Sequence, residues 1–318
     1  MDKFTLGFYN IENLFDVFDD KKILDEQFTA HAPREWNASR YKNKIHKIAR
    51  AITEIGLQTS GTPPVLLGLA EVENESVLKD LIKMTELDQY QYNYIHFDSP
   101  DERGIDVALL YRTNYFMVTQ KIAHTVYIED EFGVRDTTRD ILQVHGYLQD
   151  EPLHLLITHW PSKRDNDINA PKRLEVAKKI KELIDQIFEQ DPYANLVVMG
   201  DFNEEPNGNS IRNLGAVKTV EELQGNMLYN PMIQLKAKGR GTLTHKGQWS
   251  LFDQLMFSKS LVKGFGRLSL EEANVFDAEF LKEWSGPYKG QPFRTYIGNQ
   301  YIGGYSDHFP VFAVLGKR

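Results

Sequence analysis

The chain has 318 residues, of which 41% are hydrophobic and 26% are charged, and its net charge is −8. This composition is ordinary for a soluble globular protein. The absence of cysteine excludes disulfides, thiolate catalysis and cysteine zinc sites, so carboxylate, Asn and His side chains remain as ligands, which suit Mg²⁺, Mn²⁺ or Ca²⁺.

No stretch approaches the ~20 apolar residues that a transmembrane helix needs. The first residues lead straight into an apolar run without a visible signal peptide, so we expect a cytoplasmic protein. A secreted or periplasmic protein whose leader has been removed would show the same sequence. One domain over residues 1–318 is expected, because candidate site residues lie on both sides of the Gly- and Asn-rich stretch 207–225.

Short apolar runs alternate with amphipathic runs along most of the chain, which predicts α/β or α+β layers. In the first half, the runs 4–9 and 65–70 predict buried strands that end at Asn10 and Glu71. Further strands are expected at 92–97, 105–111 and 116–128, and helices at 41–55 and 76–84. The polar segment 16–43 is weakly patterned and is expected to be an inserted loop, either a lid or a surface excursion.

The second half continues this alternation. Two strands, 141–148 and 153–158, flank a hairpin turn at 149–152, and the second of them ends at His159. A helix is expected from Pro171 to about Gln190, and further strands at 196–200, 249–257 and 309–315. The segment 270–304 combines many aromatics with Gly and Pro, and it is the second expected insertion, again a lid or a surface excursion.

Polar residues that can hold a metal or a phosphate stand where these strands end or begin. They are Asn10, Glu71, His159, Asp201 with Asn203, and Ser306-Asp307-His308. Ligands of open α/β sheets gather beyond strand ends, so the repeated position predicts one shared site. Each residue alone also has a structural explanation: Asp201 fits a turn, Asn203 a helix cap, and His159 a structural histidine.

Motifs spread over nearly the whole chain resemble, in kind and in order, those of the endonuclease/exonuclease/phosphatase superfamily. The motifs are Ala70-Glu71, Thr158-His159, Gly200-Asp201-Phe202-Asn203 and Tyr305-Ser306-Asp307-His308-Phe309-Pro310, together with Tyr9–Asn13, Leu251–Leu255 and Thr138-Arg139-Asp140. The superfamily includes DNase I, abasic-site endonucleases, inositol polyphosphate 5-phosphatases and neutral sphingomyelinases. The resemblance implies a DNase I-like four-layer sandwich: two mixed β-sheets packed face to face between outer helices, with the site at one edge.

The resemblance also implies a metal ion and a base. Glu71 would bind Mg²⁺, for which Mn²⁺ is a reasonable substitute, and Asn10 and Asp307 would contribute further ligands directly or through water. His308 would be the general base, with Asp253 as the partner that fixes its tautomer. A carboxylate within the apolar strand around Asp253 supports this pairing, because an unpaired buried charge would be costly.

The remaining roles concern the water and the phosphate. Asp201 and Asn203 would orient the attacking water and a phosphate oxygen, and whether Asp201 or His308 takes the proton stays open. His159 would donate a hydrogen bond to the phosphate. Asp106 would orient His159, although a strand-end carboxylate with no such role explains Asp106 equally well.

Substrate contacts are expected from Arg139, whose planar guanidinium matches phosphate oxygens, and from two tryptophans. Trp160 opens the aromatic and basic turn Trp160-Pro161-Ser162-Lys163-Arg164, which departs from the better-known relatives and resembles a bacterial branch of the superfamily with poorly defined substrates. Trp160 and Trp249 could stack on bases or pack on a lipid headgroup. They could equally be core or loop anchors.

The expected function is a Mg²⁺-dependent phosphodiester hydrolase, first of all an endonuclease or exonuclease that uses water to attack phosphorus in DNA or RNA. By resemblance, its products would carry a 5′-phosphate and a 3′-hydroxyl. A phosphatase or phosphodiesterase acting on an inositol phosphate or a lipid headgroup is the alternative within this class. A non-catalytic binding module that kept the fold is the alternative of another class, and the complete set of site residues opposes it.

The charge pattern bears on the substrate. The net charge of −8 weakens the nucleic-acid interpretation only mildly, because a local positive rim around a cleft would suffice. Lys and Arg concentrate in 34–50 and 163–181, but the solvated face of an amphipathic helix is the simpler explanation for both segments. The sequence indicates no protein partner.

Overall fold

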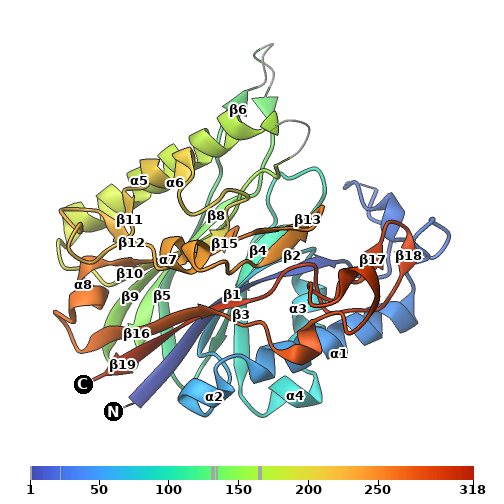
Figure 1. Cartoon of the computed structure of the whole chain (residues 1–318), viewed down its shortest axis with the longest axis horizontal. Helices are drawn as coiled ribbons and strands as arrows, with labels where there is room; N and C mark the ends of the chain where they lie inside the picture. The colour runs from blue at the N-terminus through green and yellow to red at the C-terminus, as the bar shows by residue number, and fades with distance from the viewer. Residues whose placement is uncertain (1, 22, 130–132, 134, 164–166) are drawn as a thin grey trace.

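The computed structural model describes residues 2–21, 23–129, 133, 135–163 and 167–318. Two mixed β-sheets pack face to face, and helices cover their outer sides (Figure 1). The expected four-layer sandwich is confirmed. Among the described residues, no helix combines the length and the apolarity that crossing a membrane would demand.

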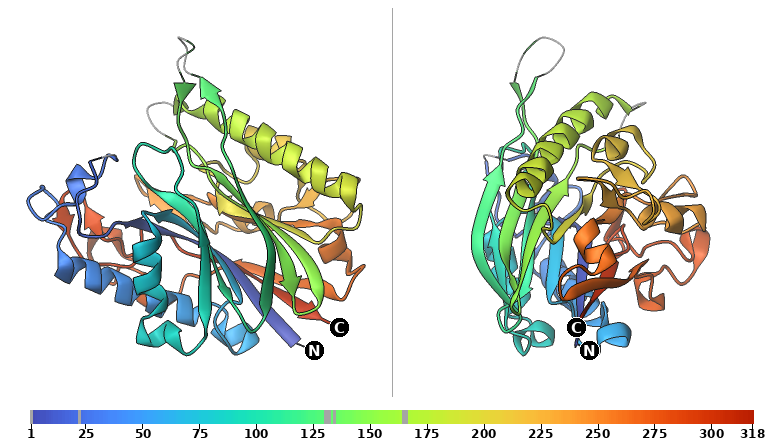
Figure 2. Two further views of the ribbon diagram at one scale, coloured as in Figure 1. Left: turned by 180° about the vertical axis from the view of Figure 1, so that it is seen from behind. Right: turned by 90° about the vertical axis from the view of Figure 1, so that its left-hand side faces the viewer.

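The first sheet has the strand order β16-β19-β1-β2-β4-β3. Its strands are β1 (Asp2–Leu14), β2 (Leu66–Val72), β3 (Tyr92–His96), β4 (Asp106–Arg112), β16 (Leu268–Val275) and β19 (Val311–Lys317). Because β1 pairs with β19 along most of its length, the two ends of the described chain lie side by side (Figure 2).

The second sheet has the order β11-β12-β15-β10-β9-β8-β5. Its strands are β5 (Phe116–His124), β8 (Ile141–Leu148), β9 (Glu151–His159), β10 (Leu196–Asp201), β11 (Ala216–Val217), β12 (Leu228–Tyr229) and β15 (Asp253–Ser258). Three short ribbons complete the strands: β6 (Ile128–Glu129) with β7 (Arg135–Asp136), β13 (Leu243–His245) with β14 (Gln248–Ser250), and β17 (Tyr296–Ile297) with β18 (Gln300–Tyr301).

The longer helices follow the apolar periodicity of the sequence. Helix α1 (Ala38–Glu54) begins at Asn37, whose side chain accepts from two backbone amides, and α3 (Glu75–Ile82) begins in the same way at Asn74. Helix α5 (Ala170–Gln190) packs its apolar face on the second sheet, on the opposite side of the molecule from α1 (Figure 2). The short helices are α2 (Leu57–Ser60), α4 (Thr85–Asp88), α6 (Asn209–Asn213), α7 (Met232–Ala237) and α8 (Lys259–Lys263), with 3₁₀ turns at Glu26–Phe28, Glu279–Leu281 and Gly286–Tyr288.

Strand direction brings the candidate residues to one edge. The pairs β1/β2 and β9/β10 are parallel, so each pair ends at the same side. The antiparallel strand β15 begins there, with Asp253 opposite Asp201, and Asp201 is also opposite His159. Strand β19 runs antiparallel to β1, so the residues before Val311 reach the same edge.

Two strand predictions need correction near this edge. Strand β1 runs past Asn10 to Leu14, with a register shift against β2 and with positive φ angles at Glu12 (52°) and Asn13 (50°). Such bulges redirect side chains beside active sites. The single strand expected at 249–257 is two strands, β14 and β15, in different sheets, so Asp253 begins a strand rather than lying within one.

The two expected insertions pack against each other. Phe15, Phe28, Trp36, Ile105 and Tyr296 form a small apolar cluster apart from the main core. The Trp36 indole donates to the carbonyl of Phe15 at 3.1 Å, and the Tyr296 hydroxyl donates to the carbonyl of Arg34 at 3.0 Å. The second insertion is shorter than expected, because residues 268–275 form the edge strand β16.

Candidate active site

Asn10 holds two carboxylates together at the shared edge. Its Nδ2 donates to Asp201 Oδ2 at 3.0 Å and to Glu71 Oε1 at 3.3 Å. Its Oδ1 accepts from the backbone N–H of Glu12 at 3.0 Å, which fixes the orientation of the amide. Because an amide oxygen has a second lone pair, this contact leaves room for a metal ion or its water, and the metal-ligand role of Asn10 stays a prediction.

Glu71 is held in its ionised form. It lies at the end of β2 with a φ of 67°, and Oε2 accepts from the backbone N–H of Asn13 at 2.8 Å. Burial alone would raise the pKa of Glu71, but the charges of Arg103, His308 and Arg139 together hold that pKa below its usual value. An ionised, partly buried carboxylate is the donor that Mg²⁺ takes from a protein.

Asp201 lies between the two halves of the site. Its Oδ1 accepts from the backbone N–H of Asn203 at 2.9 Å, and Asn203 Nδ2 donates to the carbonyl of Trp160 at 3.0 Å. Burial, reinforced by the charge of Asp253, raises the pKa of Asp201 to about 7. Asp201 can therefore exchange a proton near neutral pH.

His308 is paired with Asp253, as expected. Its Nδ1 lies 2.7 Å from Asp253 Oδ2, and its Nε2 lies 3.9 Å from Asp201 Oδ2. Burial acts to lower the pKa of His308, but the charge of Asp253 and the hydrogen bond to it outweigh burial and raise that pKa well above its usual value. The ring is therefore a cation at neutral pH.

The loop before β19 is fixed by Ser306. Its hydroxyl donates to the carbonyl of Asn10 at 2.6 Å and accepts from the backbone N–H of His308 at 3.1 Å. Asp307, between them, has a side chain that is 36% exposed, with Oδ1 4.0 Å from His308 Nε2. Asp307 can therefore reach an ion from the solvent side.

His159 faces the two carboxylates from β9. Its Nε2 is 3.7 Å from Asp201 Oδ2 and 4.0 Å from Glu71 Oε1. Burial, together with the charges of Arg139 and Arg103, lowers the pKa of His159 well below its usual value, so the ring is neutral. Its Nδ1 is buried without a hydrogen-bond partner among the described residues.

The predicted pairing of Asp106 with His159 is wrong for this structure. Asp106 Oδ1 accepts from the backbone N–H of Ser99 at 3.2 Å, and Oδ2 lies 3.5 Å from His96 Nε2. Asp106 opens β4 in the first sheet, whereas His159 ends β9 in the second. The side chain of Asp106 therefore belongs to a different group of residues.

Two arginines lie beside the cluster, and the sequence analysis named only one. Arg139 is buried, with Nε 3.1 Å from Asp101 Oδ2. Arg103 donates from Nη2 to Asn13 Oδ1 at 2.8 Å and is the largest of the charges that lower the pKa of Glu71. Both line a hollow of about 240 Å³ that Pro161 also borders. The sequence signal for Arg103 was its place three residues before β4, which begins at Asp106.

The two tryptophans differ in exposure, because Trp160 is covered on all sides whereas Trp249 lines a hollow of about 360 Å³. Trp160 is fully buried and packs edge-on against Phe202, with ring centroids 4.9 Å apart. The prediction that Trp160 contacts substrate is wrong for this reason. Trp249 is half-buried and stacks on Phe309 at 5.8 Å. Arg164, the last residue of the turn that Trp160 opens, lies outside the described residues.

A groove reaches the cluster at Asn203. It has a volume of about 840 Å³, and Lys163, His245, Lys246 and Phe252 are among its lining residues. Asp167 and Glu205 also line this groove, and Lys163 Nζ lies 3.9 Å from Asp167 Oδ2, so the groove carries charges of both signs. Strand alternation explains why Trp249 is not part of this groove, because its neighbours Gln248 and Ser250 line it instead.

A buried ion pair behind Asp307 was missed by the sequence analysis. Lys44 Nζ donates to Thr295 Oγ1 at 2.6 Å and to the carbonyl of Tyr305 at 2.7 Å, and it lies 3.8 Å from Glu12 Oε2. Burial raises the pKa of Glu12 and lowers that of Lys44. These contacts attach α1 and the second insertion to the tip of β1. A lysine within an amphipathic helix gave no signal of this role.

Comparison with known proteins assigns the family. The sequence model of the Endonuclease/Exonuclease/phosphatase family matches residues 5–317. The chain belongs to this family. Its members are phosphoric ester hydrolases that typically depend on a divalent metal ion, so the predicted enzyme class is confirmed. No protein of curated function matches the sequence.

Solved structures of this family share the fold. An endonuclease/exonuclease/phosphatase family protein from Bacteroides thetaiotaomicron is 16% identical with a TM-score of 0.60, covering 99% of this chain and 98% of that one. A mannosyl-6-phosphatase from the same organism is 16% identical (TM-score 0.58; 98% and 99% covered). Zebrafish (D. rerio) TDP2 complexed with a single-strand DNA product is 14% identical (TM-score 0.56; 99% of each chain covered).

Proposed function

We propose that the chain is a Mg²⁺-dependent phosphodiester hydrolase, with Mn²⁺ as a possible substitute, and that its substrate is DNA or RNA. The observation that carries this proposal is the buried pair of Glu71 and Asp201, bridged by Asn10, beside the His308–Asp253 pair. Three groups would then work side by side: the ionised carboxylate of Glu71, the carboxyl group of Asp201 with a pKa of about 7, and the imidazolium of His308.

Glu71 and Asp307 would hold the metal ion, whose positive charge would offset the charge of the phosphate and help the departing oxygen. Their chemistry fits the ion, because both are carboxylates and Glu71 stays ionised despite its burial. Asn10 would hold Glu71 and Asp201 at a constant separation through Nδ2, and its Oδ1 would contact the ion directly or through water.

Asp201 is the better candidate for the proton acceptor. Its pKa of about 7 suits a general base, whereas His308 already carries a proton at that pH. His308, oriented by Asp253, would stabilise the negative charge that develops on the phosphate. Asn203 would help to position the water, since its backbone N–H fixes the carboxylate of Asp201.

The phosphate would be contacted by neutral and cationic donors on the other side. His159 offers Nε2 between Asp201 and Glu71. Arg103 and Arg139 border a hollow beside it and provide guanidinium groups for phosphate oxygens. The groove that begins at Asn203, whose lining includes Lys163 and Lys246 as well as Asp167 and Glu205, would contact the remainder of the substrate.

A phosphatase or phosphodiesterase that acts on a small or lipid-linked phosphate ester is the second candidate. The burial of Trp160 favours it, because it removes one of the two aromatic side chains expected to hold bases. The structurally similar mannosyl-6-phosphatase gives a sugar phosphate as one substrate to test.

One experiment separates these candidates. Turnover is measured with Mg²⁺ on plasmid DNA, single-stranded RNA, a duplex with an abasic site, an inositol phosphate, a phospholipid headgroup diester and mannose 6-phosphate. Cleavage of a nucleic acid, with binding that weakens steeply as salt rises, would support the proposal. Turnover of a small ester alone would contradict the nucleic-acid assignment and leave the hydrolase assignment intact.

We propose one domain over residues 1–318, and the paired contacts of β1 with β19 support it. A cytoplasmic location is likewise a proposal. It would be contradicted by fractionation that finds the native protein in another compartment.

A further inference from the structure

A second group of metal-ligating side chains lies outside the catalytic cluster, where β3 ends and β4 begins. One ligand atom from each of His96, Asp98 and Asp106 lies within 4.8 Å of the other two. His96 Nε2 is 3.5 Å from Asp106 Oδ2, and His96 Nδ1 is 3.8 Å from Asp98 Oδ1. Only Asp106 had been assigned a role from the sequence.

The histidine of this group is buried without a hydrogen bond on Nε2. Its side chain is 1% exposed, and Nε2 has no hydrogen-bond partner among the described residues although a carboxylate lies next to it. A buried polar atom without a partner is costly, so its environment calls for an explanation. The separation of 3.5 Å is long for a hydrogen bond. It is close to the roughly 3.4 Å between two ligands of a tetrahedral ion with bonds of about 2.1 Å.

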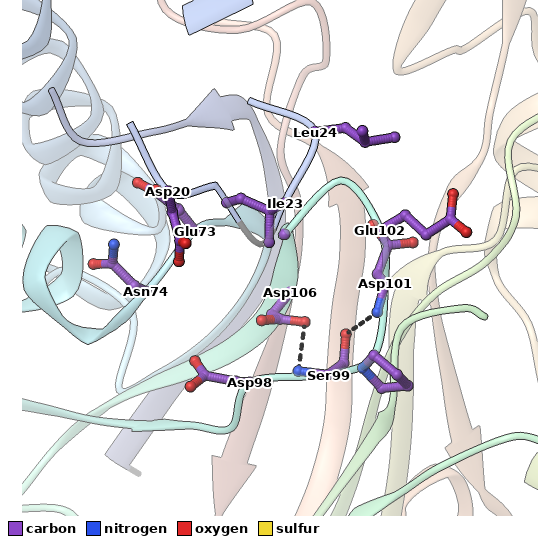
Figure 3. A pocket seen from close by; sticks show the side chains of 12 residues that line it. Asp20, Ile23, Leu24, Glu73, Asn74, Asp98, Ser99, Asp101, Glu102 and Asp106 are labelled. Atoms are coloured by element: carbon purple, nitrogen blue, oxygen red, sulfur yellow. Dashed lines mark hydrogen bonds between the residues drawn. The ribbon is translucent and has the colours of Figure 1, made fainter. Parts of the chain in front are cut away.

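The surroundings attract cations. Asp98 and Asp106 line a hollow of about 690 Å³, shown in Figure 3, that Asp20, Glu73, Asp101 and Glu102 also line. No lysine or arginine is among its described lining residues. In Figure 3 the carboxylates of Asp98 and Asp106 lie side by side below Glu73. Asp98 faces Nδ1, the other nitrogen of the His96 ring, so an ion held by Nε2 and Asp106 requires Asp98 to rotate towards Nε2, and its 87% exposed side chain has room to do so.

We propose that His96, Asp98 and Asp106 form a second cation site, selective for Zn²⁺ or a similar first-row transition-metal ion. One imidazole nitrogen and two carboxylate oxygens are a common ligand set for such an ion, with the fourth position left to water. Mg²⁺ is disfavoured because it prefers oxygen ligands alone. The site is separate from the cluster of Asp201, Asp253 and His308.

The site would act on the catalytic centre through the segment between β3 and β4. This segment carries Asp101, which pairs with Arg139, and Arg103, which contacts Asn13 beside Glu71. An ion bound to His96, Asp98 and Asp106 would link both ends of the segment. It would thereby fix the two arginines without touching the substrate.

The test uses the full chain with the catalytic cluster disabled, so that only the second site is counted. Zn²⁺ is titrated calorimetrically into the chelator-treated double variant Glu71→Gln/His308→Asn. One ion per chain is expected, together with a rise in Tm. Adding Asp98→Asn should weaken binding by at least about tenfold. Adding His96→Gln should abolish both the binding and the Tm shift.

Two features make the outcome decisive. Asp98 is exposed, so Asp98→Asn reports on binding even if His96→Gln disturbs folding. His46 pairs with Glu86 at 2.7 Å on the surface, and the matched variant His46→Gln should bind Zn²⁺ like the background. The proposal is overturned if the background binds no Zn²⁺, if Asp98→Asn binds it unchanged, or if Ca²⁺ binds and Zn²⁺ does not. The group would then be a buried histidine next to two carboxylates that binds no ion of this kind.

Discussion

Glu71 and Glu73 stand two positions apart at the end of β2, yet the charged side chains around Glu71 are mainly positive and those around Glu73 are negative. Glu71 faces Arg103, His308 and Arg139, and these charges hold its pKa below the usual value despite burial. Glu73 lines the acidic hollow, where burial and the charges of Asp16, Asp25 and Asp20 raise its pKa to about 8.

This contrast shows that the position of neighbouring cations, rather than residue type, distinguishes the two regions. In the catalytic cluster, Glu71 and Asp201 each accept hydrogen bonds from Asn10 and from a backbone N–H. In the hollow, several carboxylates share one space, and no lysine or arginine is among its described lining residues. The first arrangement suits phosphate chemistry, and the second suits the binding of a cation. The following changes test the distinction, from the largest expected effect to the smallest.

Replacement of Asp201 should have the largest effect. Asp201→Asn removes the proton acceptor while keeping the shape of the side chain, so kcat should fall by at least ~10²-fold. Turnover of the cleaved substrate, with circular dichroism and Tm as checks of folding, measures the loss. Near-normal turnover in a folded variant would reject the role of Asp201.

Removal of Arg103 should have a smaller effect. Arg103→Ala deletes a guanidinium at the phosphate hollow, and a hydrogen bond to a charged group contributes about 1.5–3 kcal/mol, so kcat/KM should fall by about 10- to 100-fold. Arg212, on the exposed helix α6, serves as the matched control. Equal kinetics for Arg103→Ala and Arg212→Ala would place Arg103 outside the site.

The pH dependence of kcat/KM should be bell-shaped. Asp201 accepts a proton only when ionised, so the rate should rise as pH passes its pKa of about 7. His308 acts as a cation and has a raised pKa, so the rate should fall at higher pH as the ring loses its proton. The acid limb should disappear in the residual activity of Asp201→Asn. A limb that persists there would assign it to another group.

The smallest effect concerns stability. The pKa of Glu73 is about 8 in the folded protein, against an ordinary value of 4.5, so the folded state keeps a proton that the unfolded chain releases. Its contribution to stability is therefore complete below about pH 4 and declines as pH rises to 8. Glu73→Gln removes this decline. The Tm difference between variant and wild type should grow by a few degrees from pH 5 to pH 8, and a constant difference would contradict the assignment.

Much of the site could be predicted because parallel strands end at one edge. Glu71, His159 and Asp201 each follow an apolar run. In the structure, His159 Nε2 lies 4.0 Å from Glu71 Oε1 and 3.7 Å from Asp201 Oδ2. Strand direction alone fixes this convergence. The His308–Asp253 pair needed the family resemblance, because 55 positions separate the two residues.

What the sequence could not provide was the direction of side chains beyond the strand ends. The bulge after Asn10 places a backbone N–H against its oxygen, and this contact orients the amide so that its nitrogen donates to Glu71 and Asp201. Asp106 faces His96, which lies on the neighbouring strand of the same sheet, and not His159. Trp160 packs inward on Phe202, although its basic neighbours suggested a binding surface. Each of these depends on three-dimensional neighbours that no local pattern specifies.

The central claim is that the strand-end cluster, and not the acidic hollow beside it, is a metal-dependent centre for phosphate ester hydrolysis. Turnover of chelator-treated wild type, Glu71→Gln and Glu73→Gln is therefore compared as Mg²⁺ is added back. We predict that wild type and Glu73→Gln regain full activity and that Glu71→Gln stays at least ~10²-fold slower at every Mg²⁺ concentration. Activity that ignores the chelator, or that survives in Glu71→Gln but not in Glu73→Gln, would contradict the account.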